Sequence, residues 1–500
     1  MSRIKNTRRI ILSGVVNRIL NLIFPFVNRT IIIWFLGADF TGLSGLFTSI
    51  LQVLSLTEFG FHMTVSYSLY KPLAEKNIEE INKMMSMLRK VYFAVGSIII
   101  AMGLIIMPFI KILIKGEYPD SINIYALFLL YLLNTGISYF LYAYKGVLIN
   151  ADQRQDLTTK INTAVCVLVN IMQFVVLIIF RNFYSYIFMT IIGSIVSNLL
   201  INRAANKRYP YLKNLPGKIE IPSEMKKQIS GLMINSLSNV SRNSLDNLVI
   251  SSTLGLVAVT KYGNYFTIYS AVFGLINIIS NSMGASVGNS IVLKSKHDNF
   301  ENLLDFSLLY SWIAGWCAAT MACLYQPFMQ LWVGEELMLP TKDMLLFVLY
   351  FYLINMNHMR NEYILGNAIW WRLKGAYLAE AIGNLVLNIV LGKLWGITGI
   401  IIATNITIFF CNYLMCNSVL FKTYFKGESI KVFYKQQFYY LAVAIVVTGV
   451  SYLFCIRFES IIIRALICIV VPNCLFAVFF YPCSRWKSSI DLVKKIISVH

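Results

Sequence analysis

The segment from Ile11 to Leu36, ILSGVVNRILNLIFPFVNRTIIIWFL, most constrains what this chain can fold into. It is apolar and long enough to cross a bilayer, which takes about 20 residues in a helix. It nevertheless contains two arginines and three asparagines. Charges in the hydrocarbon core of a membrane are costly and usually functional. The fold must therefore bring these polar groups to other helices or to water.

The polar side chains of this segment share one face of the predicted helix. At about 100° per residue they project within about 120° of one another. The two arginines are 11 positions apart, so they lie about 16 Å apart along the axis. Pro25, on the same face, would kink the helix. The stripe either packs against other helices or lines a watery cavity for an anion, and the aligned arginines favour the cavity. Its members are Asn17, Arg18, Asn21, Asn28 and Arg29.

The composition extends this prediction to the whole chain. Of the 500 residues 57% are hydrophobic and only 13% are charged, whereas a soluble domain has about 25% charged residues. We therefore expect an all-α integral membrane protein with about fourteen transmembrane helices. Hydropathy places the spans at residues 11–36, 43–68, 91–110, 124–149, 161–180, 186–205, 229–254, 262–292, 303–325, 343–366, 375–392, 396–421, 438–456 and 460–481.

The basic residues predict the orientation of these spans. Most of them fall in the N-terminal segment, the C-terminal tail and alternate loops, which places both termini in the cytoplasm. The net charge of +20 is then a topology signal, and no nucleic-acid partner is expected. The opposite loops hold only Lys111, Lys115, Arg181, Lys261, Lys342, Lys393 and Arg457.

Further charges lie inside the predicted spans. Asn235, Asn239, Arg242 and Asp246 form a narrow stripe on the span 229–254, because their spacings are 4, 3 and 4. Arg242 either helps to bind an anion or is neutralised by Asp246, one turn away. Arg360 is a further candidate ligand, whereas Arg464 is close enough to an interface to snorkel.

Intramembrane carboxylates are candidates for carrying a coupling proton, because burial can bring such a group into the titrating range. Capping or hydrogen bonding between helices is the alternative for each of them. The candidates are Glu58, Asp246 and Glu380.

An internal repeat organises the chain into two halves. Four dipeptides recur at a common offset of 219 residues, and Leu36-Gly37 recurs as Leu254-Gly255 at 218. Six predicted helices separate the copies, so both halves enter the membrane in the same direction. We expect a six-helix N-terminal lobe at 1–205, a cytoplasmic linker at 206–228, a six-helix C-terminal lobe at 229–421, and two additional helices with a tail at 422–500. The four pairs are Phe47-Thr48 with Phe266-Thr267, Pro108-Phe109 with Pro327-Phe328, Leu127-Phe128 with Leu346-Phe347, and Leu130-Tyr131 with Leu349-Tyr350.

No pattern in the chain indicates catalysis or a cofactor. A GxxxxGK[ST] phosphate loop, an HExxH motif and a CxxC motif are all absent from the sequence. Eight of the nine cysteines fall inside apolar runs, which is typical of small buried hydrophobic side chains rather than of disulfides or metal ligands. We therefore expect no enzyme activity, no metal and no cofactor.

The stretch from Leu36 to Glu75, LGADFTGLSGLFTSILQVLSLTEFGFHMTVSYSLYKPLAE, resembles the signature of polysaccharide transporters. These are the Wzx-type O-unit and capsule-unit flippases of the multidrug, oligosaccharidyl-lipid and polysaccharide exporter superfamily. The likeness recurs at SLDNLVISSTLG (244–255), YGNY (262–265) and SVGN (286–289). The resemblance implies two six-helix lobes around a central cavity that alternate between inward-open and outward-open states.

The resemblance implies a flippase for undecaprenyl-diphosphate-linked oligosaccharides in the bacterial cytoplasmic membrane. Its product would supply O-antigen, capsule or exopolysaccharide synthesis, with membrane lipid and a polysaccharide polymerase as partners. Arginine suits such a cargo because guanidinium groups bind phosphate oxygens through charge-assisted, bidentate hydrogen bonds. The alternatives are a peptidoglycan-precursor flippase and a cation-coupled multidrug exporter of the same fold.

Overall fold

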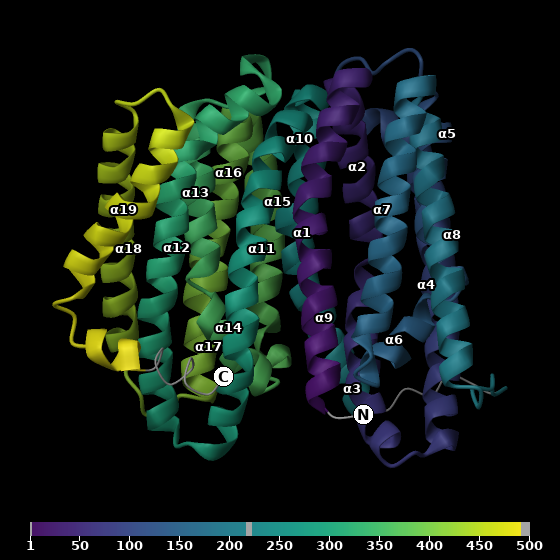
Figure 1. The fold of residues 1–500 in the computed structure, drawn as a ribbon, viewed down its shortest axis with the longest axis horizontal. Coiled ribbons are helices and arrows are strands. Elements are labelled where there is room, and N and C mark those ends of the chain that lie inside the picture. The colour runs from purple at the N-terminus through teal and green to yellow at the C-terminus, as the bar shows by residue number, and fades with distance from the viewer. Residues whose placement is uncertain (1–2, 217–222, 492–500) are drawn as a thin grey trace. The chain divides into compact units, whose positions relative to one another are not determined.

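The computed structural model describes residues 3–216 and 223–491, and every regular element in these ranges is a helix (Figure 1). This confirms the predicted all-α class. The chain divides into two compact units, Met1–Gly263 and Asn264–His500. This division does not decide the predicted lobe boundaries, since the helices that were assigned to the start of the second lobe fall in the first unit.

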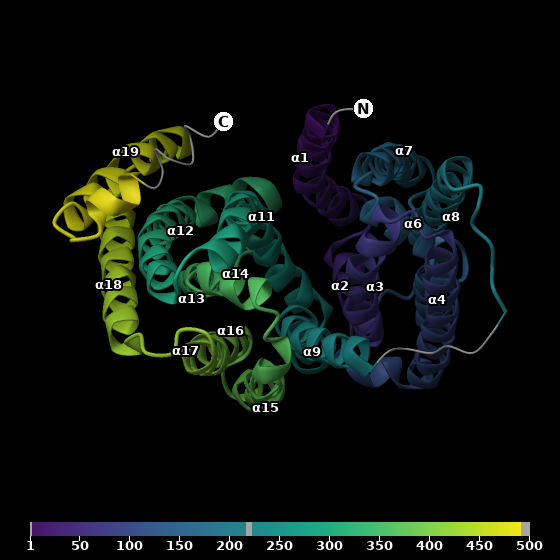
Figure 2. The same cartoon turned by 90° about the horizontal axis from the view of Figure 1, so that it is seen from below.

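The first unit contains the N-terminal helices and the connection that follows them. Within it α1 packs on α7 and α7 on α8 (Figure 2). Helix α4 packs on α5, and α9 and α10 pack on α3 and α2 respectively. Its elements are α1 (Arg3–Phe35), α2 (Ala38–Leu54), α3 (Leu56–Ala74), α4 (Ile78–Ile106), the 3₁₀ segment η1 (Met107–Leu113), α5 (Ile124–Phe140), α6 (Ala143–Ala151), α7 (Gln155–Phe180), α8 (Phe183–Arg208), α9 (Ser223–Val240), the π-helical segment η2 (Ser241–Leu245) and α10 (Asp246–Leu254).

The second unit begins within α11 (Leu256–Leu293), the helix in which the division falls, and contains most of that helix. In this unit α12 packs against α13, α18 and α19, and α16 packs against α13 and α15. Its elements are α12 (Lys296–Val333), η3 (Glu335–Leu337), α13 (Thr341–Asn355), α14 (His358–Gly366), η4 (Trp370–Leu373), α15 (Lys374–Trp395), α16 (Ile397–Thr407), the π-helical segment η5 (Ile408–Met415), α17 (Cys416–Thr423), α18 (Ile430–Cys455) and α19 (Ile461–Phe480).

Short polar side chains set where several helices begin. The side-chain oxygens of Asn77, Asn123, Asn182 and Ser295 accept backbone N–H groups in the first turns of α4, α5, α8 and α12. Such N-caps satisfy donors that have no partner within the helix. These four helices therefore start at positions that the local sequence marks.

The internal repeat is visible in the backbone. Gly37 and Gly255 join successive helices with backbone φ values of 108° and 89°. Residues that have a Cβ atom rarely adopt such positive φ values. The order of the elements also repeats: α4 is followed by the broken pair α5 and α6, just as α12 is followed by the broken pair α13 and α14. The order of the helices thus agrees with the predicted repeat, and two further helices, α18 and α19, follow the second copy.

Nine helices in the described ranges are long and apolar enough to span a membrane, and α5 with α6 forms a tenth candidate bent by 49°. Each predicted span falls on one helix or on consecutive helices of the structure. Several spans are broken into two helices, as at 343–366, where the pieces have 15 and 9 residues and neither alone is long enough to cross a membrane. The number fourteen stays a prediction.

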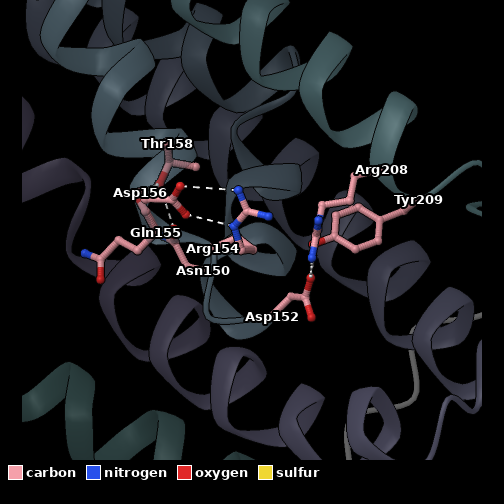
Figure 3. A network of polar contacts seen from close by, with 8 residues as sticks. All are labelled: Asn150, Asp152, Arg154, Gln155, Asp156, Thr158, Arg208 and Tyr209. Atoms are coloured by element: carbon pink, nitrogen blue, oxygen red, sulfur yellow. Dashed lines mark hydrogen bonds and ion pairs between the residues drawn. The ribbon is translucent and has the colours of Figure 1, made fainter. Parts of the chain in front are cut away.

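A polar cluster closes one end of the first unit (Figure 3). Arg154 donates to both carboxylate oxygens of Asp156, with N···O distances of 2.9 and 3.3 Å. Asp152 accepts from Arg208 at 2.9 Å and from the Tyr209 hydroxyl at 2.8 Å. Burial, together with the neighbouring Asp152, raises the pKa of the Tyr209 hydroxyl above its usual value. The cluster ties the turn before α7 to the end of α8.

A close approach between α15 and α16 yields a prediction about stability. A Cβ atom at Gly399 would lie 1.9 Å from the backbone oxygen of Leu391, whereas a Cβ atom at Gly449 in α18 would meet nothing within 4 Å. Because a backbone atom cannot rotate away, Gly399→Ala should destabilise the protein by about 1–3 kcal/mol. Gly449→Ala, the matched control, should be neutral or stabilise by up to about 1 kcal/mol, since alanine favours a helix. Thermal unfolding in detergent measures both, and equal melting temperatures would contradict the predicted clash.

Candidate functional site

A cavity of about 650 Å³ lies within the first unit, among α1, α2, α5, α7 and α8. Its volume is in the range of small-molecule binding sites. No Asp, Glu, Lys or Arg is among the described residues that line it. The polar lining consists of Asn28, Ser44, Thr48, Gln52, Ser55, Tyr131, Asn134, Thr135, Tyr139, Asn162, Asn170, Gln173, Tyr186, Thr190, Ser194 and Ser197.

Hydrogen bonds between helices hold part of this lining in place. Ser194 of α8 donates to Asn134 of α5 at 2.7 Å, and Ser197 donates to Asn162 of α7 at 2.7 Å. Gln173 of α7 donates to the Thr190 hydroxyl at 2.8 Å. These side chains satisfy one another between helices that would otherwise carry polar groups into lipid. The wall is therefore a connected polar surface supported by three helices.

Asn170 is a lining residue whose own polar groups point away from the cavity space. Its amide nitrogen donates to the backbone oxygen of Cys166 at 2.7 Å. Its side-chain oxygen is buried and has no hydrogen-bond partner in the described structure. Leaving such an atom without a partner costs free energy.

The polar stripe of α1 serves both of the purposes that the sequence left open. Asn17 donates to Thr163 of α7 at 2.7 Å, and Asn21 donates to Asn17 at 2.7 Å. Asn17 therefore links α1 to α7, and Asn21 supports Asn17 from within α1. Asn28, two to three turns further on, lies instead on the cavity. One stripe contains a packing segment and a cavity-facing segment.

The arginines of α1 lie outside the lining of the cavity. Arg29 donates to the backbone oxygen of Thr260 at 3.1 Å. A Cβ atom at position 263 would lie only 2.7 Å from Nη2 of Arg29. Gly263 has no Cβ atom and therefore leaves space for the guanidinium group. Arg18 is half-buried. The structure thus separates the two charges from the neutral cavity in the same unit.

Arg242 is buried in the π-helical segment between α9 and α10. It donates to the Ser238 hydroxyl at 3.1 Å and to the side-chain oxygen of Asn239. Asp246, fully buried, accepts from the Tyr262 hydroxyl at 2.7 Å. The wider π turn changes the register that an ideal helix would give these residues. Both Arg242 and Asp246 form hydrogen bonds to neighbouring protein side chains.

Arg360 and Glu380 belong to one buried network in the second unit. Arg360 donates to the Asn361 side chain at 2.7 Å, and to both the backbone oxygen and the side-chain oxygen of Asn412, at 2.5 and 2.8 Å. Asn412 in turn donates to Glu380 at 2.8 Å. Arg360 is 2% exposed and Glu380 is 0% exposed. Asn412 therefore connects the arginine to the carboxylate.

The side chain of Glu58 lies outside the described residues. A second carboxylate group in the second unit is described: Ser280 donates to Glu362 at 3.3 Å and contacts His358 Nδ1 at 3.1 Å. Gly284 leaves the space that the Glu362 carboxylate occupies. This group links α11 to α14 through polar contacts.

Sequence reasoning missed most of the cavity, since it examined charges rather than neutral polar residues. The signal was nevertheless present in the chain. On α7, Asn162, Asn170 and Gln173 share one face, because their spacings of 8 and 3 follow the helical period. On α8, Thr190, Ser194 and Ser197 repeat at spacings of 4 and 3. Neutral polar stripes on predicted membrane helices would have indicated the cavity.

Long apolar helices, a repeated order of helices and a polar cavity together define a multi-pass membrane protein. Comparison with known structures agrees with this class. The structure is similar to the lipid II flippase MurJ in an inward closed conformation, with a TM-score of 0.66 and 18% sequence identity. The match covers 94% of this chain and 99% of MurJ.

Transporters of the MATE family, within the MOP superfamily, share the fold. A MATE transporter in its bent conformation matches with a TM-score of 0.55 at 13% identity, over 84% of this chain and 97% of that one. A Vibrio cholerae MATE transporter matches with a TM-score of 0.54 at 15% identity, over 84% and 98%. No family model and no curated protein matches the sequence. The fold of the chain is thus that of MurJ and the MATE transporters.

The cavity predicts which native thiol meets water. Cys166 lines it, whereas Leu168, two residues away on α7, is 52% exposed on the outer surface of the helix. The thiolate, which forms in water and not in lipid, attacks a charged, membrane-impermeant thiol reagent. In permeabilised membranes Cys166 should therefore react at least about tenfold faster than a cysteine introduced by Leu168→Cys in a Cys166→Ser background. Mass spectrometry of the labelled peptide measures both rates. Equal rates at the two positions would show that the cavity is not hydrated.

Proposed function

We propose that this protein is a flippase that moves undecaprenyl-diphosphate-linked oligosaccharides across the bacterial cytoplasmic membrane by alternating access. The observation that carries the proposal is the neutral polar lining of the cavity in the first unit. Sugars present many hydroxyl groups, which donate and accept hydrogen bonds without charge. Amide and hydroxyl side chains are matched to such a surface.

The same observation weighs against the multidrug exporter. A cationic drug gains most from carboxylates in its binding site, because charge-assisted hydrogen bonds are about twice as strong as neutral ones. The described lining of the cavity offers amides, hydroxyls and apolar groups in their place. A glycan is therefore the better match to the cavity, although MATE transporters share the fold.

The diphosphate of the proposed cargo requires cations, and α1 provides them. We assign this role to Arg18 and Arg29, with Asn17 and Asn28 on the same stripe. Arg242 and Arg360 donate to buried protein acceptors. We assign them a second contribution to diphosphate binding, from helices later in the chain. Glu58, Asp246 and Glu380 are the carboxylates proposed for proton coupling.

A peptidoglycan-precursor flippase is the second candidate function, and the similarity to MurJ over nearly the full length of both chains favours it. Its cargo has the same chemistry, a glycan joined to a prenyl lipid through a diphosphate. The two candidates differ in the sugar and peptide groups that the cavity must accept.

We propose that both termini are cytoplasmic and that a polysaccharide polymerase receives the flipped unit.

Transport in proteoliposomes tests the proposal. The intact protein should translocate a fluorescent undecaprenyl-diphosphate-linked oligosaccharide. Arg18→Ala and Arg29→Ala should each slow transport roughly tenfold or more, because each removes charge-assisted hydrogen bonds to the diphosphate. Arg457→Ala, which removes a charge from an exposed loop, is the matched control and should transport normally.

The outcomes separate the function from the site. Normal transport by both folded α1 variants would refute the diphosphate assignment and leave the flippase standing. Transport of lipid II alone would select the peptidoglycan-precursor flippase. Transport of a cationic dye alone would select the exporter, and transport of none of these cargoes by the folded protein would refute the proposed function.

A further inference from the structure

Three cysteines that are far apart in the sequence meet inside the second unit. They come from the middle of α12, the last residue of α18 and the second turn of α19. Cys323, Cys455 and Cys468 are 1%, 0% and 1% exposed. Their three Sγ atoms lie within 4.8 Å of one another. Sequence reasoning treated each of them separately as a small hydrophobic side chain, and only the packing of three helices brings them together.

We propose that these three thiols form a binding site for a soft, thiophilic metal ion of the Cu(I) class. Thiolate sulfur selects Cu(I) and related soft ions over hard ones. Three sulfurs bound at about 2.3 Å in a trigonal plane around one ion lie about 4 Å apart. The Sγ atoms of Cys455 and Cys468 are already 4.0 Å apart. An ion could therefore be held with only small shifts of the three side chains.

The number of ligands favours Cu(I) over zinc. Structural zinc sites are nearly always tetrahedral with four protein ligands. Among the described residues the group contains three cysteines and no further Cys, His, Asp or Glu. A set of three sulfur ligands leaves the tetrahedral coordination of zinc incomplete, whereas it is sufficient for Cu(I). The site is thus matched to the softer ion.

The surroundings supply charge and polarity to a buried thiolate site. Arg464, one turn before Cys468, places a positive charge near Cys455 and Cys468. Its Nε donates to the backbone oxygen of Phe458 at 2.6 Å, which holds it at this end of α19. Ser451, one turn before Cys455, has a buried hydroxyl with no hydrogen-bond partner in the described part of the chain. Both groups offset the cost of placing negative sulfur in an apolar interior.

The site lies beneath a short exposed turn. Residues Ile456 and Arg457, directly after Cys455, are exposed. An ion can therefore reach the thiols by local opening of the turn between α18 and α19 rather than by unfolding of the unit. Binding would displace thiol protons, because the thiolate is the form that ligates a metal. A bound ion would also join α12, α18 and α19 and raise the stability of the unit.

Metal binding by the full-length protein tests the proposal. The reduced protein in detergent should bind one Cu(I) per chain in competition with a chromogenic chelator, and X-ray absorption should report sulfur ligands alone. Cys323→Ser, Cys455→Ser and Cys468→Ser should each weaken binding by roughly two orders of magnitude or more. Cys317→Ser, which changes a cysteine of α12 outside the group, is the matched control and should bind as the intact protein does.

Any of three results would overturn the proposal. One is undiminished Cu(I) binding by the folded triple variant of the three positions, and another is the absence of Cu(I) binding by the folded, reduced intact protein. If a serine variant fails to fold, the alanine variant replaces it. The sulfur signal of the intact protein decides the question without any variant, since light-atom ligands alone would also refute the site.

Discussion

The interior of a bilayer provides no hydrogen-bond partners, and the rest of this structure depends on that constraint. Backbone groups must be satisfied within helices, and polar side chains must reach one another or water. Arg360 illustrates the first solution, because it is 2% exposed and donates to two asparagines. The cavity in the first unit illustrates the second, since its polar groups surround a space.

Departures from the ideal α-helix occur where polar groups must be placed. The π-helical segment Ile408–Met415 contains Asn412, which bonds to both Arg360 and Glu380. A second π-helical segment, Ser241–Leu245, contains Arg242. A π turn inserts one residue into the helical register and turns a side chain toward a new neighbour. Broken helices and π turns thus let long apolar helices carry internal polar contacts.

The buried network around Glu380 and the cavity of the first unit use polar groups differently. The described network of the second unit pairs charged groups with amides in the interior, as at Glu380 and Asn412. The first unit leaves amides and hydroxyls such as Asn134 and Ser194 on the wall of a cavity. A polar network that is satisfied internally rigidifies a fold, whereas one facing a cavity remains open to a ligand. This contrast is the physical basis for placing the proposed glycan site in the first unit.

The sequence by itself determined the membrane class, the positions of the helices and the repeat, because the transfer of apolar residues into lipid is a sum over neighbouring residues. The recurring dipeptides Leu36-Gly37 and Leu254-Gly255 are also a local feature of the sequence. In the structure both glycines have positive φ values. Only the tertiary structure decided which polar residues face a cavity and which link helices, as Asn28 and Asn17 show. It also brought together Cys323 and Cys468, 145 positions apart along the chain. Such contacts depend on how distant helices pack, and no local sum over the sequence contains that information.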